Sequence, residues 1–343
     1  MKIFRKFLSI AVAATVLGGP ATAQEVTLRF QHFISPKGAI PAHFGAPWAE
    51  KIEAESDGRI KVEIYPAMQL GGTPPMVYDQ IRDNVIDGGW AIPGYNPGRF
   101  PGTEVFELPF ISSNNAEVTS KAVYDFYEKY LQDDFADIKL IAIHVHGPGA
   151  FHTKDVQIDS VDDFAGLKLR APTRVASLTL EALGATPVGM PVPQLPESIS
   201  KGVVDGGVIP FEIVAPLKIH ELATSHTVVG GDRALYNTVF IWGMNKGVYE
   251  GLPDDLKAVI DANSGAMAAA WAGRAMDTGD IPGKKLTEES GNPIITLSDE
   301  EVAKMVEMTQ PVIDAWIAEM TELGLPAAEM VEDARALVAK YDQ

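Results

Sequence analysis

The sequence of 343 residues predicts an α/β fold with two lobes of similar construction. Three observations support this prediction. The chain exceeds the usual length of a single domain, it opens with a strand-helix-strand pattern, and one phrase occurs in it twice. Residues 85–93 (VIDGGWAIP) resemble residues 203–210 (VVDGGVIP), and each copy follows a helix-like segment that ends at Asn84 or Gly202. These two residues suit a left-handed turn, although chance recurrence of a common turn is the alternative explanation.

The first 23 residues have the features of a secretory signal peptide. A basic start at residues 2–6 precedes an apolar run at residues 7–17, and residues 21–23 (ATA) have the small-x-small form of a cleavage site. No later stretch of the sequence approaches the roughly 20 uninterrupted apolar residues of a transmembrane helix. We therefore expect residues 1–23 to be removed on export and the rest of the chain to be soluble.

Charge and cysteine content exclude several classes of function. Residues 1–23 carry three of the 28 basic residues and none of the 46 acidic ones, so the rest of the chain has a net charge of −21. A chain this acidic repels nucleic acid and anionic lipid, and neither is expected as a partner. The sequence contains no cysteine, which excludes disulfides, thiolate metal sites and cysteine nucleophiles.

The period of the apolar residues predicts the elements in chain order. Residues 26–30 form a strand, residues 48–55 a helix, and residues 60–65 a second alternating strand. This opening favours a parallel sheet covered by helices. The later elements are an extended piece at 106–110, a helix at 116–131, a strand at 139–146, a strand through Arg170 followed by a helix to 184, a strand at 186–190, a long strand at 236–245, one long helix at 253–280 bent at 264–265, a strand at 294–296, and helices at 298–323 and 327–340.

The chain is expected to cross between the lobes at two places. One is the glycine-proline break at residues 147–149, and the other is the long apolar strand that follows residue 235. We therefore expect lobe I to comprise residues 24–147 and 236–282, and lobe II to comprise residues 148–235 and 283–343.

The segment around Arg170 indicates a binding site for a carboxylate. Leu167 and Leu169 alternate with polar residues, so Arg170 emerges at the carboxyl end of a strand, where ligands sit in open α/β sheets. Pro172 and Thr173 then start a helix, whose free N–H groups favour an anion. A planar guanidinium can hold a carboxylate bidentately. The alternative is an arginine paired with a neighbouring Asp or Glu.

Six short segments occur in the chain in a characteristic order and spacing, namely residues 65–71 (YPAMQLG), 106–110 (FELPF), 166–172 (GLKLRAP), 204–206 (VDG), 218–222 (KIHEL) and 252–256 (LPDDL). Together they resemble the periplasmic solute receptors of tripartite ATP-independent periplasmic (TRAP) transporters, of the C4-dicarboxylate-binding DctP type. The resemblance covers essentially all of the chain after the signal peptide.

The resemblance implies both architecture and function. It implies a two-lobe periplasmic solute-binding-protein fold in which two lobes, joined by a long helix, close on the solute. The arginine that matches Arg170 forms a salt bridge with the ligand carboxylate in this family. A monomeric receptor in the periplasm that hands a small organic acid to the membrane permease subunits is the implied function, without catalysis and without a cofactor.

Three departures from the sialic-acid-binding members bear on the ligand. Those members carry an acidic residue at the position of Ile92, an asparagine near Ile209 and a second arginine near residues 147–151. Here these positions are apolar, glycine or alanine. A sugar acid is therefore disfavoured, because each hydroxyl buried without a partner costs on the order of 1–3 kcal/mol.

The remaining candidate site residues surround the expected cleft. Arg174 lies one helical turn beyond Arg170 and is either a second carboxylate donor or a solvated charge. His146 is expected to donate a hydrogen bond at the mouth of a strand; it shares a strand face with His144, but no third ligand at a matching spacing supports a metal. The apolar and polar wall residues in the candidate set are Phe33, Trp90, Ile209, Phe211, Asn237, Phe240 and Trp242.

These residues predict an apolar monocarboxylate as the ligand. Flat aromatic side chains can bury a ring, and a single clamp arginine suits one carboxylate better than two. An aromatic acid such as a benzoate is expected ahead of a branched aliphatic 2-oxo or 2-hydroxy acid. A dicarboxylate remains the alternative if Arg174 faces the cleft.

Two further classes of function stay open at the sequence level. A secreted hydrolase of similar two-lobe shape is one, although the sequence contains no Gly-x-Ser-x-Gly elbow, Walker loop or Gly-x-Gly-x-x-Gly fingerprint after a strand. The binding protein of an ATP-driven importer is the other.

Overall fold

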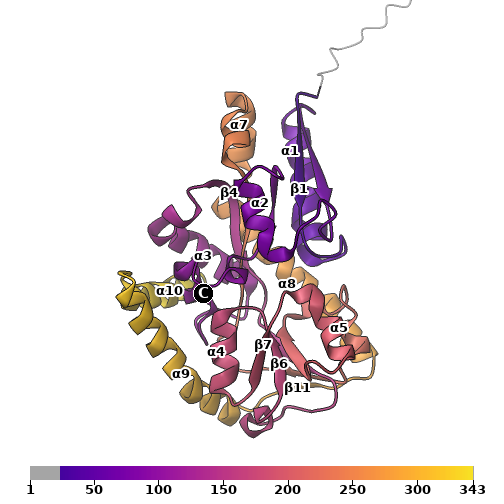
Figure 1. Cartoon of the computed structure of the whole chain (residues 1–343), viewed down its shortest axis with the longest axis vertical. Coiled ribbons are helices and arrows are strands. Elements are labelled where there is room, and N and C mark those ends of the chain that lie inside the picture. The colour runs from indigo at the N-terminus through magenta and orange to yellow at the C-terminus, as the bar shows by residue number, and fades with distance from the viewer. Residues whose placement is uncertain (1–23, 343) are drawn as a thin grey trace, which may run out of the picture.

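The computed structural model describes residues 24–342, and the predicted signal peptide lies outside them. The chain forms two β-sheets, and helices accompany each of them (Figure 1). One long helix, α8 (Ala266–Glu289), lies between the two halves of the molecule, and another, α9 (Asp299–Glu322), runs along the side of the second half. None of the helices in residues 24–342 is long and apolar enough to cross a membrane. The predicted α/β class is confirmed by this architecture.

The first sheet has the strand order β2-β1-β3-β10-β4. Its strands are β1 (Val26–Gln31), β2 (Ile60–Tyr65), β3 (Gly88–Ala91), β4 (Ile138–Val145) and β10 (Val239–Asn245). β1 is parallel to β2 and β3, as the opening of the sequence predicts, whereas β10 is antiparallel to both β3 and β4. The sheet is mixed because β10 enters it from the second half of the molecule, in the reverse direction.

Helices and aromatic rings fill the space beside the first sheet. The helices are α1 (Ala46–Glu55), α2 (Val77–Arg82), α3 (Ala116–Tyr130), α6 (Lys246–Glu250) and α7 (Asp254–Ala262). Trp242 of β10 lies in this core, stacked on Phe30 at 5.4 Å between ring centroids and edge-on to Trp48 at 6.0 Å. These large side chains are fully buried, and rings of this size dominate the burial of apolar surface.

The second sheet has the strand order β11-β9-β5-β8-β6-β7. Its strands are β5 (Ala150–Thr153), β6 (Lys168–Ala171), β7 (Thr186–Gly189), β8 (Gly206–Ile209), β9 (Ser225–Val228) and β11 (Ile294–Thr296). β6, β7 and β8 are parallel to one another, and α4 (Arg174–Ala182) and α5 (Leu195–Ser200) follow β6 and β7. The carboxyl ends of these three strands therefore meet at one edge.

The repeated phrase forms equivalent units in the two sheets. α2 leads to β3 and α5 leads to β8, and the residue that ends each helix has the left-handed conformation that the sequence predicts, with φ of 56° at Asn84 and 68° at Gly202. Each strand is followed by a short 3₁₀ turn, Pro93–Tyr95 in the first copy and Phe211–Ile213 in the second. The other short 3₁₀ turns are Pro74–Met76, Pro101–Glu107, Asp133–Phe135, Val161–Phe164, Val192–Gln194 and Ile219–Glu221.

Three sequence predictions about elements are wrong. The first two residues of the extended piece expected at 106–110 end the 3₁₀ turn Pro101–Glu107, and the other three form a bend and a turn. The single helix expected at 253–280 is two helices, because Gly265 takes φ 78° and its N–H donates to Ile141 O at 2.8 Å; α8 (Ala266–Glu289) begins after this break. The long strand expected from residue 236 begins at Val239 instead.

The C-terminal helices divide between the two halves of the molecule. α9 (Asp299–Glu322) packs along α4, whereas α10 (Ala327–Tyr341) packs on α3. Lys129 of α3 pairs with Glu329 at 3.0 Å, and Lys340 of α10 pairs with Asp125 at 2.7 Å. The assignment of residues 327–341 to lobe II therefore does not match their packing, and the other predicted lobe boundaries stay predictions.

Candidate functional site

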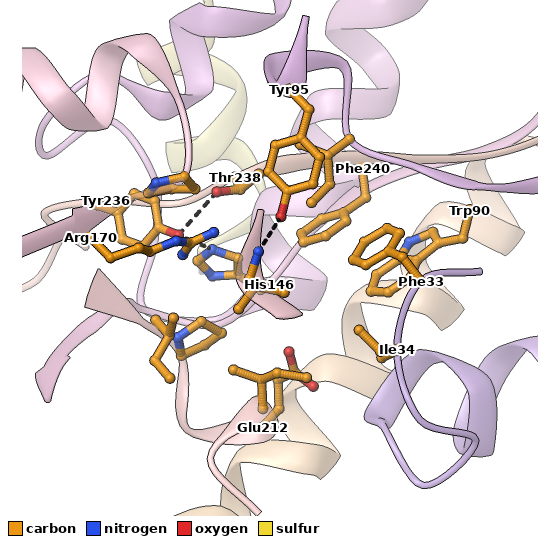
Figure 2. Close-up of a pocket in the computed structure, with 16 residues that line it drawn as sticks. Phe33, Ile34, Trp90, Tyr95, His146, Arg170, Glu212, Tyr236, Thr238 and Phe240 are labelled. Carbon is orange, nitrogen blue, oxygen red and sulfur yellow. Dashed lines mark hydrogen bonds between the residues drawn. The ribbon is translucent and has the colours of Figure 1, made fainter. Parts of the chain in front are cut away.

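A cavity lies where strand ends from both sheets face each other (Figure 2). The cavity is small, with a volume of about 30 Å³. This is far below the range of about 300–1,000 Å³ for small-molecule sites, so a ligand can enter only when the two sides of the cavity move apart. The lining residues are Phe33, Ile34, Trp90, Ile92, Tyr95, His146, Arg170, Pro172, Val192, Ile209, Pro210, Glu212, Ile213, Tyr236, Thr238 and Phe240.

Arg170 is the buried cation of this cavity. It stands at the carboxyl end of β6 between β7 and β8, and only 2% of its surface is exposed. Its Nε donates to Met190 O at 2.9 Å and its Nη1 to Val208 O at 3.2 Å. Within residues 24–342, no carboxylate lies within 4.0 Å of the guanidinium, so the alternative of a neighbouring Asp or Glu partner is wrong for this part of the chain.

The remaining donors of Arg170 make the cavity suitable for an anion. A guanidinium has five N–H donors, and the two backbone carbonyls use two of them. A buried charge without an opposite charge is costly, and an anion in the cavity would remove this cost. The carbonyls fix the orientation of the side chain while leaving its charge uncompensated.

Four rings form a parallel stack on the first-sheet side of the cavity. Phe33 lies on Trp90 with centroids 4.7 Å apart and an interplanar angle of 3°, and Phe240 lies 4.8 Å from Trp90 at 10°. His144 lies beside Trp90 in a nearly parallel plane, and the Trp90 Nε1–H donates to its Nε2 at 3.0 Å. Phe240 packs across both rings, 5.1 Å from His144. The Trp90 indole is thus held in its plane. Burial lowers the pKa of His144 to about 3, which keeps the ring neutral.

Thr238, Tyr236 and His146 form a chain of hydrogen bonds in the wall beside Arg170, in which each hydroxyl donates to the next residue. Thr238 donates to the Tyr236 hydroxyl at 3.1 Å, and this hydroxyl lies 3.1 Å from His146 Nε2. The Nδ1 of His146 faces Gly147 O, so Nδ1 carries the proton and Nε2 accepts from Tyr236. Burial lowers the pKa of His146 to about 4, with a smaller contribution from Arg170. His146 is therefore a neutral ring whose two nitrogens both have partners, rather than the free donor that we expected.

Tyr95 connects the two sides of the cavity and was missed by sequence reasoning. It ends the 3₁₀ turn Pro93–Tyr95, and its hydroxyl oxygen accepts from Val192 N at 3.0 Å. The hydroxyl proton is free to donate beside Arg170, the guanidinium that Tyr95 also contacts. Glu212 reaches the cavity from the equivalent 3₁₀ turn after β8. In each copy of the repeat, the residue two positions after the proline enters the cavity, and this signal was present in the sequence.

Arg174 does not line the cavity, which corrects its prediction as a second carboxylate donor. Its Nε donates to Glu104 at 3.1 Å and its Nη1 to Glu319 of α9 at 2.7 Å. The buried Glu104 also accepts from Trp316 Nε1 at 3.0 Å. The side chain turns toward α9 because α4 begins at Arg174, and Thr173 caps the helix through Ala176 N.

Three other predicted wall residues lie elsewhere. Phe211 points away from the cavity and packs on His152 at 5.1 Å, because its neighbours Pro210 and Glu212 take the inward positions. Trp242 shares a strand face with Phe240 but lies further along β10, in the core of the first sheet. Asn237 is buried, and its amide nitrogen donates to Tyr236 O at 2.7 Å and Gly147 O at 3.2 Å in the orientation that satisfies its neighbours.

Six of the ten predicted site residues line the cavity, namely Phe33, Trp90, His146, Arg170, Ile209 and Phe240. Within residues 24–342, no group of three or more His, Asp or Glu side chains is arranged to hold a metal ion. The lining combines one unpaired cation with flat apolar walls. Such a site suits a small anion with an apolar body.

The fold and this site define a two-lobe receptor for a small solute. The family model described as "Bacterial extracellular solute-binding protein, family 7" (DctP) matches residues 30–319, and the chain belongs to this family. The predicted TRAP solute-binding identity is thereby confirmed, and the fold agrees with solved TRAP receptors.

Three known proteins illustrate the relationship. A marine metagenome TRAP solute-binding protein specific for aromatic acid ligands, solved with 3-hydroxybenzoate, is 46% identical with a TM-score of 0.92, covering 94% of this chain and 100% of that one. A TRAP solute-binding protein of Rhodoferax ferrireducens T118, solved with copurified benzoate, is 43% identical with a TM-score of 0.90, covering 92% and 98%. The C4-dicarboxylate-binding periplasmic protein DctP of Rhodobacter capsulatus is 26% identical over 342 residues, 95% of each chain.

Proposed function

We propose that this protein is the periplasmic receptor of a TRAP transporter for an aromatic monocarboxylate, which it delivers to the membrane permease without transforming it. The observation that carries the proposal is the buried guanidinium of Arg170, unpaired by any carboxylate of residues 24–342, beside a wall of stacked rings. The two solved relatives at 46% and 43% identity bind 3-hydroxybenzoate and benzoate, which supports the same ligand class here.

The carboxylate is held by Arg170 and Tyr95. The free N–H groups of Arg170 offer a charge-assisted fork, and the Tyr95 hydroxyl adds a donor from the opposite side of the cavity. A charge-assisted hydrogen bond contributes about 1.5–3 kcal/mol. Since one donor comes from each side, the carboxylate also joins the two walls.

The ring of the ligand lies against the apolar wall. Phe33, Trp90 and Phe240 present parallel faces, and Ile92 and Ile209 add aliphatic surface. Stacked aromatic pairs are worth about 0.5–1.5 kcal/mol beyond the burial of their area. A saturated dicarboxylate or a sugar acid offers no face to stack and leaves polar groups opposite apolar ones.

A dicarboxylate is disfavoured by the position of Arg174. Its guanidinium is shared by Glu104 and Glu319 outside the cavity, so it offers a second ligand carboxylate no partner. The second carboxylate of succinate would instead meet Ile92, Ile209 or the carboxyl group of Glu212, none of which is a cation. The charge pattern of the cavity therefore favours one carboxylate.

The ligand is identified in two measurements. Mass spectrometry of the protein purified without added ligand identifies any acid that copurifies with it. Calorimetric competition then compares the affinities for benzoate, 2-oxoisovalerate, succinate and a sialic acid. We expect benzoate to bind at least tenfold more tightly than the other three. Tightest binding of succinate or the sialic acid would contradict the proposal.

A further inference from the structure

Glu212 is a buried acid that faces the cavity and that carboxylate binding does not use. It lies in the 3₁₀ turn Phe211–Ile213, lines the cavity and is 6% exposed. Its Oε2 has no hydrogen-bond partner among the described residues. Figure 2 shows its carboxyl group well separated from the guanidinium of Arg170. A buried polar atom without a partner is costly, so this oxygen marks a place for a polar group of the ligand.

The surroundings hold this carboxyl group in one position. The backbone of Ala39 forms a hydrogen bond with it, and its own backbone N–H donates to Asp280 Oδ1 of α8 at 2.7 Å. The helix approaches closely because Gly279 lacks a side chain; a Cβ there would lie 2.9 Å from the Glu212 Cβ. The carboxyl group is therefore fixed at the cavity wall before any ligand binds, which reduces the entropy that binding must overcome.

The charge state of Glu212 selects the polar group that it can bind. Burial, followed by the nearby Asp280, raises the pKa of Glu212 to about 8, and burial raises the pKa of Asp280 to about 7. Lys284 is the cation that acts on Asp280. A protonated carboxyl group both donates and accepts a hydrogen bond, as a hydroxyl does. An ammonium group would instead require an ionised Glu212 in a buried site beside a second acid.

We infer that Glu212 is a specificity-determining residue that binds a hydroxyl group of the ligand, so that the ligand class is a hydroxylated aromatic monocarboxylate. Arg170 holds the carboxylate, and Glu212 reads a hydroxyl on another part of the molecule. This inference rests on the proposed function and refines it. Substituents without a hydrogen-bonding group leave Oε2 unsatisfied, and this cost provides the discrimination.

Calorimetry with four ligands tests the inference. Benzoate and the 2-, 3- and 4-hydroxybenzoates are titrated into the wild type, Glu212→Gln and Glu212→Met. We expect the wild type to bind at least one hydroxybenzoate tenfold or more tightly than benzoate. Glu212→Gln keeps a donor and an acceptor and should retain most of this ratio. Glu212→Met should lower it to about one, because the hydroxyl loses its partner and benzoate no longer leaves a buried oxygen unsatisfied.

A matched control and two further ligands separate the outcomes. Glu107→Gln changes another buried acid with a pKa raised to about 8 that does not line the cavity, and its ratio should equal that of the wild type. If Glu212→Met does not fold, the methylbenzoate with its methyl group at the position of the preferred hydroxyl serves instead: wild-type binding as tight as that of the preferred hydroxybenzoate contradicts the inference. If 3-(aminomethyl)benzoate binds most tightly, Glu212 binds an ammonium group rather than a hydroxyl group, and this result too contradicts the inference.

The inference and the proposed function fail in different ways. A wild type that binds no aromatic acid overturns the proposed function. A wild type that binds benzoate and hydroxybenzoates with a ratio that Glu212→Met leaves unchanged overturns the inference alone, since the clamp and the stack would then suffice.

Discussion

At the scale of single residues, the site depends on groups whose polar partners are fixed by the backbone. Arg170 is oriented by two carbonyls, His146 by Gly147 O and Tyr95 by Val192 N. Each side chain keeps at least one other hydrogen-bonding group that is directed at the cavity or at a neighbouring side chain in its wall. Side chains preorganised in this way lose little conformational freedom when a ligand binds.

Removing the guanidinium should abolish tight binding. We expect Arg170→Ala to weaken benzoate binding tenfold to a hundredfold, because the variant loses charge-assisted bonds worth about 1.5–3 kcal/mol to a desolvated carboxylate. Arg170→Lys should recover only part of the loss, since an ammonium lacks the planar fork. Isothermal titration calorimetry measures both, with the exposed Arg29→Lys as control. Unchanged affinity in Arg170→Ala would place the clamp elsewhere.

Two buried histidines should make stability depend on pH. The Nδ1 atoms of His152 and His226 are 2.6 Å apart, and burial lowers the pKa of His152 to about 3 and of His226 to about 4. These values lie below the ordinary 6.5, so the unfolded chain binds protons that the folded chain does not. The stability due to the neutral rings is therefore complete above pH 6.5 and is lost as the pH falls toward about 4.

Urea unfolding of a variant isolates this contribution. Relative to His226→Gln, the wild type should lose up to about 1.4 kcal/mol of unfolding free energy per pH unit between pH 6.5 and pH 4. The comparison with a variant is needed because Glu107 and Glu212, whose pKa values are raised from 4.5 to about 8, make the folded protein less stable as the pH rises from about 4.5 toward 8, a range that overlaps the experiment. The exposed His43→Gln is the control. Parallel pH profiles of wild type and His226→Gln would contradict the prediction.

The sequence allowed the main site residue to be predicted and misplaced others for a physical reason. Arg170 could be found because alternation on a strand gives its face and Pro172-Thr173 marks the strand end. Phe211 and Trp242 were misplaced because apolar rings suit the core and the cavity equally well. The type of a residue does not show whether it lies in the core of a sheet or at the end of a strand beside the cavity, and this position is set only by the packing of the sheets.

At the scale of elements, helices and strands with a clear apolar period could be predicted to within a few residues. β2 and β11 coincide with the predicted strands, and α3 differs by one residue from the predicted helix. The failures lie where tertiary contacts override the local pattern. Residues 253–280 have a helical composition throughout, yet a hydrogen bond from Gly265 N to β4 breaks them into α7 and α8.

The contact between α4, α9 and the turn Pro101–Glu107 should contribute to stability. Arg174→Met leaves the buried Glu104 with Trp316 as a partner but without a cation, and we expect a loss of about 1–3 kcal/mol in unfolding free energy. Glu104→Gln combined with Arg174→Met should recover part of the loss, because no charge is then buried unpaired. A double-mutant cycle by urea unfolding measures the coupling. Additive effects of the two substitutions would show that the pair does not interact.

At the scale of the whole molecule, the two sheets could be predicted from the repeated phrase, but the course of the C-terminus could not. α10 packs on α3 through ion pairs between residues 200 or more positions apart, such as Lys129 with Glu329. An amphipathic helix shows that one face is buried without showing what buries it. Hydrogen bonds between the two sides of the cavity include those of Tyr95 with Val192 and Arg174 with Glu104.

The proposed position of the ligand carboxylate predicts that ligand drives closure. A carboxylate that bridges Arg170 and Tyr95 binds the closed arrangement more tightly than an open one, and a ligand shifts the equilibrium by that difference. Small-angle X-ray scattering should show a smaller radius of gyration with saturating benzoate than without it. Arg170→Ala at the same benzoate concentration is the control. Scattering profiles that coincide with and without ligand would contradict the prediction.

The enclosure of the cavity also bears on kinetics. Trp90, Arg170, Ile209 and Phe240 are each at most 5% exposed, so a molecule held among them would be largely shielded from solvent while the walls touch. Escape is then a first-order event timed by separation of the walls rather than by the strength of any one contact. Acids of different affinity would share a common upper limit to their release rate. A membrane partner that separates the walls would act on that step, and would accelerate release of the solute without competing with the receptor for it.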